Sequence, residues 1–405
     1  MRVVLFTGKG GVGKTTAAAA TAALVARRGR KTLVLSTDPA HSLSDALGEP
    51  LGPEPREIDT GLAAMEVNAQ LRFERGWRDV QGYLLDLLAR GGVDGLQAEE
   101  MVVLPGAAEV VALLEVRDQV AAGRWDAVIV DCAATAETLR LLALPEALSW
   151  YVERVFPTHR RMVRSLRPVL GRIAGGLGGT ALPPDGVLDA VTRLHGELAD
   201  VRGLLTDPAT TSVRLVLTPE SVVVAEARRT LTSLSLYGFQ VDSVLANRVV
   251  PEPADPAGGT GPDPWLAAWA ATHAEQLEVV RESFAGIPVR CAAYRPAEPV
   301  GLPALLELAR ELYADDDPMA EPPAADLVEV ERVGEQYVLR LALPFAERSE
   351  VGVARSGDEL VLTVGPHRRL FTLPSGLRRC TVVGAEFAAG TLRVRFRPDP
   401  RLWPK

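Results

Sequence analysis

A glycine-rich loop near the start of the chain carries residue types that bind phosphate. Residues 8–16 read GKGGVGKTT and fit the pattern GxxxxGK[ST]. The loop lies between an apolar run at residues 2–7 and an alanine-rich stretch at residues 15–28, which predicts strand, loop and helix in succession. Glycines let backbone amides converge on phosphate oxygens, and the helix amino terminus adds a favourable dipole. The loop therefore predicts a nucleotide-phosphate site.

The side chains of this loop have expected roles. Lys14 is expected to reach the outer phosphates, and the Thr15 hydroxyl is expected to ligate magnesium. Only 4 of the 44 basic residues are lysines, and two of them, Lys9 and Lys14, lie here. This is either chance or a requirement for a compact ammonium group, which a planar guanidinium cannot replace. The predicted nucleotide-binding residues of the loop are Gly10, Gly11, Val12, Gly13, Lys14, Thr15 and Thr16.

Two aspartates follow predicted strands and are expected at the same edge of a sheet as the loop. Residues 31–37 and 125–131 are almost continuously apolar, which is typical of a parallel sheet covered on both faces. Ligands bind beyond the carboxyl ends of such strands. We therefore expect Asp38 to orient and deprotonate an attacking water, and both Asp38 and Asp131 to hold magnesium through its hydration shell. The alternative for each is a helix cap or a turn residue.

The first 315 residues otherwise repeat this pattern, with two helical interruptions. Apolar runs at residues 212–218 and 241–247 extend the predicted fold, a P-loop α/β domain with a doubly wound, mostly parallel sheet. Residues 69–124 and 145–205 read as amphipathic helices, which we interpret as insertions. Their apolar faces either pack together or form a groove for a hydrophobic client.

The pattern changes after a segment rich in proline and aspartate. Residues 316–325 are expected to link the domain at residues 1–315 to a second domain at residues 326–405. Strands of period two, separated by polar turns, predict an all-β sandwich there. In residues 391–397, alternation is expected to place the three arginines on one face and the apolar residues on the other.

Composition excludes several classes of protein. The chain has 405 residues, 47% hydrophobic and 24% charged, as in ordinary globular proteins of more than one domain. A net charge of −8 argues against a nucleic-acid partner. No apolar run reaches the roughly 20 residues that cross a bilayer, and no signal peptide precedes the first strand. We therefore expect a cytoplasmic protein without an integral membrane segment. Because Cys132, Cys291 and Cys380 form no CxxC, no zinc site is expected.

Together these motifs resemble the ArsA family of ATPases, which includes the arsenite-pump ATPase and the Get-type ATPase that targets tail-anchored membrane proteins. The resemblance rests on KGGVGKTT, on STDPAHSLSDAL at residues 36–47, on a strand ending in Asp131 before TLRLLALP, and on LANRVVPE at residues 245–252. It implies ATP and Mg²⁺ as ligands, ATP hydrolysis and a homodimer. Residues 326–400 resemble the α-crystallin domain of small heat-shock proteins.

The resemblance also implies residue roles. Lys9 matches the extra lysine of the deviant Walker A ATPases, which reaches across the dimer to the phosphates of the facing subunit. Asp38 matches the water-activating aspartate of switch I, and Asn247 matches the adenine-reading asparagine. The loop at residues 292–301 would close over the base.

Switch II departs from the family pattern. Residues 131–140 read DCAATAETLR, where DTAPTGHTLR is usual. Ala136 replaces a glycine whose backbone approaches phosphate freely, and Glu137 adds a negative charge. We therefore expect ATP binding with slow turnover. The metalloid-binding cysteines of the pump have no counterpart in either predicted insertion, and the stretch after Asn247 lacks the zinc-clamping CxxC of eukaryotic Get-type relatives.

The leading hypothesis is a chaperone-like homodimeric ATPase that couples its nucleotide state to a hydrophobic client or a membrane-protein segment. The alternatives are an ATP-binding scaffold or switch with little turnover, and an ATPase subunit of a membrane transporter. We also expect a chain that ends near residue 315 to bind ATP without the C-terminal domain.

Overall fold

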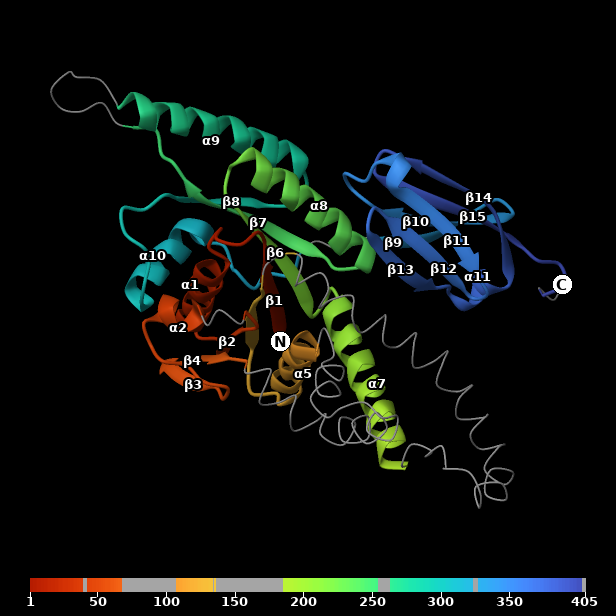
Figure 1. Ribbon diagram of the computed structural model, residues 1–405, viewed down its shortest axis with the longest axis horizontal. Coiled ribbons are helices and arrows are strands. Elements are labelled where there is room, and N and C mark those ends of the chain that lie inside the picture. The colour runs from red at the N-terminus through yellow and green to blue at the C-terminus, as the bar shows by residue number, and fades with distance from the viewer. Residues whose placement is uncertain are drawn as a thin grey trace, which may run out of the picture. The chain divides into compact units, whose positions relative to one another are not determined.

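The computed structural model divides the chain into two compact units. Figure 1 labels the helices and strands. The first comprises residues 1–67, 122–139 and 205–405, and the second residues 68–121 and 140–204. The structure describes residues 1–38, 42–67, 107–133, 135, 185–253, 263–322 and 327–402. Most of switch II, much of both predicted insertions and the loop at residues 254–262 lie outside these ranges, as do Pro39 and the substituted positions Ala134, Ala136 and Glu137.

An eight-stranded sheet forms the centre of the first unit. Neighbouring strands are parallel except for the antiparallel pair β3–β4. The predicted doubly wound, mostly parallel sheet is confirmed. In spatial order the strands are β3 (Arg56–Asp59), β4 (Leu62–Glu66), β2 (Thr32–Ser36), β5 (Ala127–Asp131), β1 (Arg2–Thr7), β6 (Thr211–Leu217), β7 (Val241–Val249) and β8 (Val289–Ala293).

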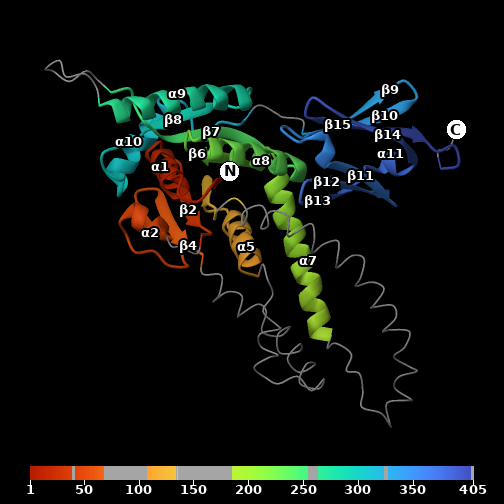
Figure 2. The same cartoon turned by 45° about the horizontal axis from the view of Figure 1, so that its top comes forward.

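The apolar runs become the buried strands of this sheet. Every residue of β1, β2, β5 and β6 is buried, as expected for strands covered on both faces. The pattern does not predict β3, β4 and β8, because β3 is polar and the other two have few of the β-branched residues that mark β2 and β5. Helix α1 (Lys14–Arg27) packs against α10 (Leu302–Tyr313), and α8 (Ser221–Tyr237) packs against α9 (Pro264–Ser283) (Figure 2).

The alanine-rich sequence of α1 suits its position. Its small side chains, such as those of Ala18, Ala19 and Ala20, are completely buried, so the helix lies close to the sheet. After β2, the short helix α2 (Ser42–Leu47) packs against α1. A strand, a glycine loop and a well-packed helix therefore follow one another at the start of the chain, as the sequence predicts.

The described part of the second unit is helical. Helix α5 (Ala107–Ala121) and helix α7 (Asp185–Thr206) fall within the two predicted insertions, although the last two residues of α7 belong to the first unit. An ion pair joins Arg117 of α5 to Glu197 of α7 at 3.7 Å. Among the described residues, no helix combines the length and the apolarity needed to cross a membrane.

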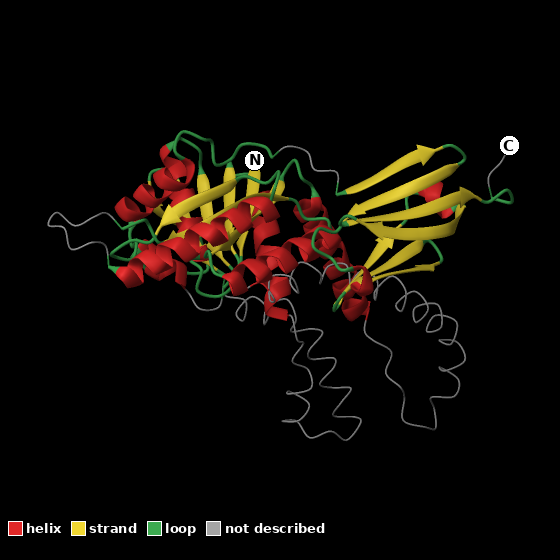
Figure 3. Ribbon diagram, turned by 90° about the horizontal axis from the view of Figure 1, so that it is seen from above, coloured by secondary structure: helices red, strands yellow, loops and turns green. Residues whose placement is uncertain are grey.

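The C-terminal region is built almost wholly of strands (Figure 3). One sheet has the order β14-β15-β10-β9 and the other β11-β12-β13, all antiparallel. The predicted all-β sandwich is confirmed, with β11 and β14 as unpredicted additions. The strands are β9 (Val328–Val333), β10 (Gln336–Ala342), β11 (Val351–Ser356), β12 (Glu359–Val364), β13 (His367–Thr372), β14 (Cys380–Ala388) and β15 (Thr391–Pro398), with the short helices η1 (Arg348–Glu350) and α11 (Ser375–Arg378) between them.

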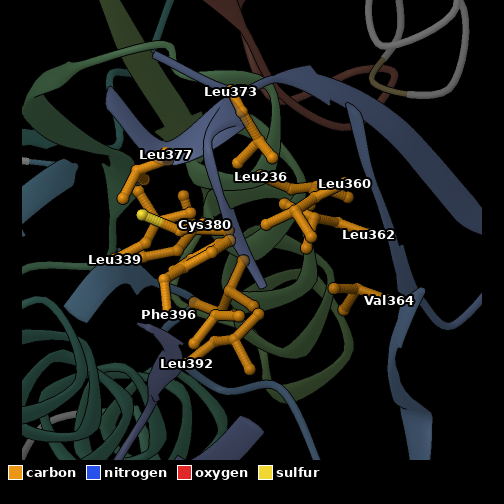
Figure 4. Packing of buried hydrophobic residues seen from close by; sticks show 13 residues of the cluster. Leu236, Leu339, Leu360, Leu362, Val364, Leu373, Leu377, Cys380, Leu392 and Phe396 are labelled. Atoms are coloured by element: carbon orange, nitrogen blue, oxygen red, sulfur yellow. The ribbon is translucent and has the colours of Figure 1, made fainter. Parts of the chain in front are cut away.

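The sandwich encloses a buried apolar cluster (Figure 4). On β15 the side chains alternate as predicted: Leu392, Val394 and Phe396 are buried in the cluster, while the intervening arginines are exposed. One member of the cluster, Leu236, comes from helix α8, which lies in the chain between β6 and β7 of the parallel sheet, and is fully buried. The core of the sandwich is therefore completed by a residue more than ninety positions before its first strand.

Polar contacts also join α8 to the sandwich. Arg369 of β13 donates a hydrogen bond to the carbonyl of Leu236, and the Thr232 hydroxyl donates to the carbonyl of Pro344. The guanidinium of Arg228 lies 5.4 Å from the ring centroid of Phe345. Together with Leu236, these contacts fasten the last turns of α8 to the sandwich.

The first residues of the segment expected to be a linker pack against the region of the eight-stranded sheet. Arg30 pairs with Asp317 at 2.7 Å, and Arg290 pairs with Asp316 at 2.9 Å. Met319 is buried. The chain is therefore anchored as it leaves this region, and the full extent of a linker at residues 316–325 stays a prediction.

Candidate nucleotide-binding site

The glycine loop joins β1 to α1 at the carboxyl edge of the sheet. Two of its glycines are required by close approaches. A Cβ atom at Gly8 would lie 2.1 Å from the carbonyl oxygen of Val216. Gly13 has a left-handed φ of 93°, and a Cβ there would lie 2.3 Å from Nδ2 of Asn247. Side chains at these positions would therefore distort the loop.

Lys14 is the first residue of α1 and turns back over the loop. Its side chain is almost wholly buried, and Nζ donates a hydrogen bond to the carbonyl of Lys9 at 3.3 Å. The ammonium group thus lies against the backbone that would surround a phosphate, and phosphate oxygens are stronger acceptors than a single carbonyl.

A hydroxyl and carboxylate cluster lies beside Lys14, at the ends of β2 and β5. Asp131 is fully buried, and its Oδ2 accepts hydrogen bonds from Oγ1 of Thr15 at 2.8 Å and from Oγ of Ser36 at 3.0 Å. Thr15 also shares a hydrogen bond of 2.9 Å with Ser42 of α2. Ser36 and Asp131 are cross-strand partners, which explains why residues far apart in sequence meet here.

The electrostatics of Asp131 are unusual for a carboxylate. Burial raises its pKa to about 6, although the hydrogen bonds from Thr15 and Ser36 and the charge of Lys14 act to lower it. Its second oxygen, Oδ1, is buried without a hydrogen-bond partner in the described structure. A cation or a cation-bound water near Oδ1 would satisfy this oxygen and stabilise the ionised carboxylate.

These groups fit a magnesium ion that is held jointly with phosphate. Mg²⁺ prefers oxygen ligands and keeps several waters, so it is usually bound by one or two protein groups together with substrate phosphates. The Thr15 hydroxyl and the orphaned Oδ1 of Asp131 provide such oxygens. Within the described ranges, no cluster of three or more His, Cys, Asp or Glu could hold a metal by itself, which is compatible with this shared mode.

Asp38 is placed by the same serine that contacts Asp131. The backbone amide of Asp38 donates a hydrogen bond of 3.2 Å to Oγ of Ser36, directly after β2. The turn that carries the predicted water-activating carboxylate is thus tied to the cluster of Thr15, Ser36 and Asp131. The three residues that follow Asp38 lie outside the described ranges.

Lys9 points to helix α8 in this structure. Its Nζ lies 4.0 Å from Oε2 of Glu226, and its side chain is 40% exposed. The two lysines of the loop therefore have different surroundings: Lys14 is buried over the loop, whereas Lys9 lies at the surface, where a second molecule can reach it. Thr135 of switch II lines a small cavity beside Lys9 and Glu226.

The end of β7 contacts the outer side of the loop. Nδ2 of Asn247 donates a hydrogen bond to the carbonyl of Val12 at 2.9 Å, and Nη1 of Arg248 donates to the carbonyl of Gly11 at 3.0 Å. The structure thus brings Asn247 to the nucleotide loop. The sequence analysis did not identify Arg248 as a site residue. The one signal for it is its position directly after Asn247 in the motif LANRVVPE.

The loop expected to cover a base begins beside Asn247. The amide of Tyr294 donates to the carbonyl of Val249 at 2.7 Å, and Arg295 pairs with Glu311 of α10 at 2.6 Å. The start of the loop at residues 292–301 is therefore anchored to β7 and α10, and its role at a base stays a prediction.

A glycine loop between a buried strand and a helix, with Lys14 over the loop and an aspartate at the end of the neighbouring strand, defines a P-loop nucleoside triphosphatase. The family model described as anion-transporting ATPase, ArsA, matches residues 1–314, and a model described as an HSP20-like domain found in ArsA matches residues 334–396. The chain belongs to the ArsA family of ATPases and carries an HSP20-like domain, as the motifs indicate.

Similar proteins support both assignments. A protein of Chlorobaculum tepidum with the provisional name arsenical pump-driving ATPase is 38% identical over 98% of this chain and 96% of its own length. A similarly named protein of Aquifex aeolicus is 31% identical over 93% of this chain and 95% of its own length. The ATPase GET3 of Paracoccidioides brasiliensis is 32% identical over 62% of this chain and 73% of its own length.

Proposed function

We propose that this ArsA-family ATPase binds Mg²⁺ and ATP at the loop of residues 8–16 and hydrolyses ATP slowly as a homodimer. The observation that carries the proposal is the buried cluster of Asp131, Thr15 and Ser36 beside Lys14. A fully buried carboxylate with a raised pKa and an orphaned oxygen is unfavourable in an empty fold. It becomes favourable when a cation is bound, which is typical of a functional site.

The residues of the site have separate proposed roles in binding and hydrolysing ATP. Backbone amides of residues 10–13 and the ammonium of Lys14 bind the phosphates, and the positive helix terminus of α1 assists them. Thr15, Asp38 and Asp131 would hold Mg²⁺ and its waters at this site. The ion neutralises charge on the phosphates when it is bound. Asp38 orients the attacking water, and Lys9 of the facing subunit stabilises the charge that develops on the transferred phosphoryl group.

We expect slow ATP turnover because switch II departs from the usual family sequence. Cys132 follows Asp131 and is buried. Further along switch II, Ala136 and Glu137 stand where the family usually has glycine and histidine. These changes remove backbone freedom and add a negative charge to a loop that is expected to sense phosphate, so we expect hydrolysis to be impaired more than binding.

The test measures Mg²⁺-dependent ATP turnover of the purified chain beside Asp38→Asn and Lys14→Ala. Slow turnover in the wild type, abolished in Asp38→Asn with ATP affinity preserved, and weak ATP binding in Lys14→Ala, support the proposal. Rapid turnover would overturn the slow-hydrolysis part. ATP bound with no turnover in any variant would favour the alternative function, a nucleotide-dependent scaffold or switch.

The homodimer is part of the proposal because one chain contains one P-loop and Lys9 is exposed beside it. Sedimentation of the Asp38→Asn variant with and without Mg²⁺ and ATP tests this point. We expect the dimer fraction to rise with nucleotide. A monomer at all nucleotide concentrations would exclude the action of Lys9 in a facing subunit.

We propose that nucleotide state controls a hydrophobic partner, with the action of a cytoplasmic chaperone. This rests on the similarity to GET3 and on the HSP20-like domain. The names of other relatives favour a second candidate, an ATPase subunit of a membrane transporter. Co-purification from membranes with an integral membrane protein would favour the second candidate, and suppression of aggregation of an unfolded protein in an ATP-dependent manner would favour the first.

A further inference from the structure

The end of β7 breaks the regular geometry of its strand. Along β7 the pairing with β8 runs from Ala246 to Val249, whereas along β8 it advances only from Cys291 to Ala293. The strand β7 therefore contains one extra residue, which is the definition of a β-bulge. Within this bulge Arg248 has a left-handed backbone, with φ of 55°.

This bulge changes where two consecutive side chains point. In a regular strand, neighbouring side chains lie on opposite faces of the sheet, so Asn247 and Arg248 would point away from each other. Instead, both reach the nucleotide loop: Asn247 donates to the carbonyl of Val12 at 2.9 Å and Arg248 donates to the carbonyl of Gly11 at 3.0 Å. Consecutive residues of β7 thus hold consecutive carbonyls of the loop.

The left-handed backbone at Arg248 is unfavourable for its residue type. A Cβ atom crowds the backbone at positive φ, and glycine, asparagine and aspartate are the residues that adopt this region readily. Such strain persists where surrounding contacts maintain it, and it is concentrated at functional sites. If only the backbone shape mattered at this position, glycine would serve better than arginine.

We propose that Arg248 is a positioning residue that pre-forms the nucleotide loop, an inference that rests on the proposed function of that loop. Gly11 itself has φ of 83°, so the loop backbone depends on glycine freedom and has few side chains to restrain it. By holding the carbonyl of Gly11 from outside, the guanidinium of Arg248 prevents the peptide from rotating. The amides of the loop then face the phosphate position before nucleotide arrives, which lowers the entropy lost on binding.

The experiment compares Arg248→Gly and Arg248→Lys with the wild type in the full chain. Glycine relieves the strained backbone while it removes the guanidinium. Lysine keeps the charge but loses the fixed planar geometry of the donor group. The matched control is Arg332→Ala, because Nε of Arg332 donates to the carbonyl of Gly334 at 3.2 Å, also from an exposed position, in a turn of the sandwich.

We expect Arg248→Gly to weaken Mg²⁺-dependent ATP binding about three- to tenfold, the effect of losing one hydrogen bond of ordinary strength, because the bond from Arg248 is exposed to solvent. KM should rise by a similar factor with kcat changed less, because the loss acts on ground state and transition state alike. The thermal midpoint without nucleotide should stay the same or rise. Arg248→Lys should lie between wild type and glycine, and Arg332→Ala should match the wild type.

Amide hydrogen exchange of residues 8–13 in the nucleotide-free protein provides a readout that does not depend on ATP. Faster exchange in Arg248→Gly, confined to this loop, supports the proposal. The proposal is overturned if exchange of the loop amides is unchanged in Arg248→Gly, or if this variant binds ATP as tightly as the wild type. It is also overturned if the thermal midpoint of the nucleotide-free variant falls together with its ATP affinity. If the wild type binds no ATP, the proposed function fails, and exchange alone decides whether Arg248 positions the loop.

Discussion

At the scale of single residues, the site is defined by one buried carboxylate. Asp131 ends β5 inside the fold, where burial raises its pKa to about 6 in spite of two hydroxyl donors. The pKa of this carboxyl group is higher in the folded chain than in the unfolded chain. Folding therefore becomes less favourable as the pH rises from the unfolded pKa to the folded pKa. Its charge is therefore a stability cost that a bound cation relieves.

This cost predicts a pH-dependent effect of Asp131→Asn on the nucleotide-free protein. Near pH 3 and below, Asp131 is largely protonated in both states and the variant should resemble the wild type. Between about pH 4 and 6 the wild type loses stability as its unfolded chain ionises first, and above pH 6 the difference should level off at about 3 kcal/mol in favour of the variant. Urea unfolding at about pH 3 and pH 8 checks this.

The control for that measurement is Asp126→Asn. Asp126 precedes the same strand and accepts a hydrogen bond from the exposed amide of Lys31. It should show no gain at pH 8. In the presence of Mg²⁺ and ATP the order should reverse, because only the wild type gains stability from the ligand. A variant less stable than the wild type at pH 8 without ligand would contradict the argument.

Lys9 offers a second residue-scale prediction. Because its ion pair with Glu226 is long and partly exposed, Lys9→Ala should change the stability of the nucleotide-free protein by less than about 1 kcal/mol. Turnover should fall by about 10³-fold or more, as for the loss of a charge donated in trans. Initial-rate assays and unfolding curves measure the two effects. Turnover retained at half the wild-type rate would remove Lys9 from the catalytic group.

At the scale of elements, helix α8 belongs to both parts of the first unit. Glu226, in its second turn, faces Lys9 of the nucleotide loop, while Leu236 and Tyr237, in its last turn, contact the sandwich. Gly238, with φ of 87°, ends the helix in the left-handed conformation, which turns the chain toward β7. A single helix therefore borders the site at one end and fills the core of the sandwich at the other.

The packing of α8 predicts that Leu236→Ala destabilises the protein by about 2–5 kcal/mol, since the substitution leaves a cavity in a closed core. The control is Val222→Ala in the same helix, where the side chain is 63% exposed and the change should stay within about 0.5 kcal/mol. Urea unfolding compares the two. Equal effects would show that the sandwich does not enclose Leu236 in solution.

At the scale of the whole molecule, the two parts of the first unit depend on each other to different degrees. Every residue assigned to the nucleotide site, including the loop at residues 292–301, precedes the first strand of the sandwich at Val328, so the site needs no side chain from the sandwich. The sandwich, in contrast, receives Leu236 from outside. Removing the sandwich would expose Leu236 and Tyr237, which are buried in the intact chain.

We therefore predict two separate results for a chain that ends at residue 322. Its ATP affinity should stay within about threefold of the intact protein, and its thermal midpoint should fall by several degrees as apolar surface on α8 becomes exposed. Calorimetric titration and thermal unfolding measure these quantities. Loss of ATP binding would contradict independent sites, and an unchanged midpoint would contradict the packing of α8.

Local patterns predicted the parts of the protein whose structure depends on nearby residues. The P-loop, α1 and the buried strands follow from glycine spacing, helix propensity and apolar runs, and the alternation in β15 follows from strand geometry. The sequence did not predict some mixed or short strands, because pairing with neighbouring strands defines them more than their own residues do. These strands are β3, β4, β8, β11 and β14.

Sequence by itself determined the class of fold and the glycine loop, and it singled out Lys14, Thr15, Asp38, Asp131 and Asn247 as candidate site residues, because these depend on motifs of a few residues. Tertiary structure alone decided three other features: the contact of Asp131 with Ser36, the bulge that turns Arg248 to the loop, and the place of Leu236 in the sandwich. Each joins segments far apart in the chain, and such contacts depend on strand order, register and burial, which no local pattern specifies.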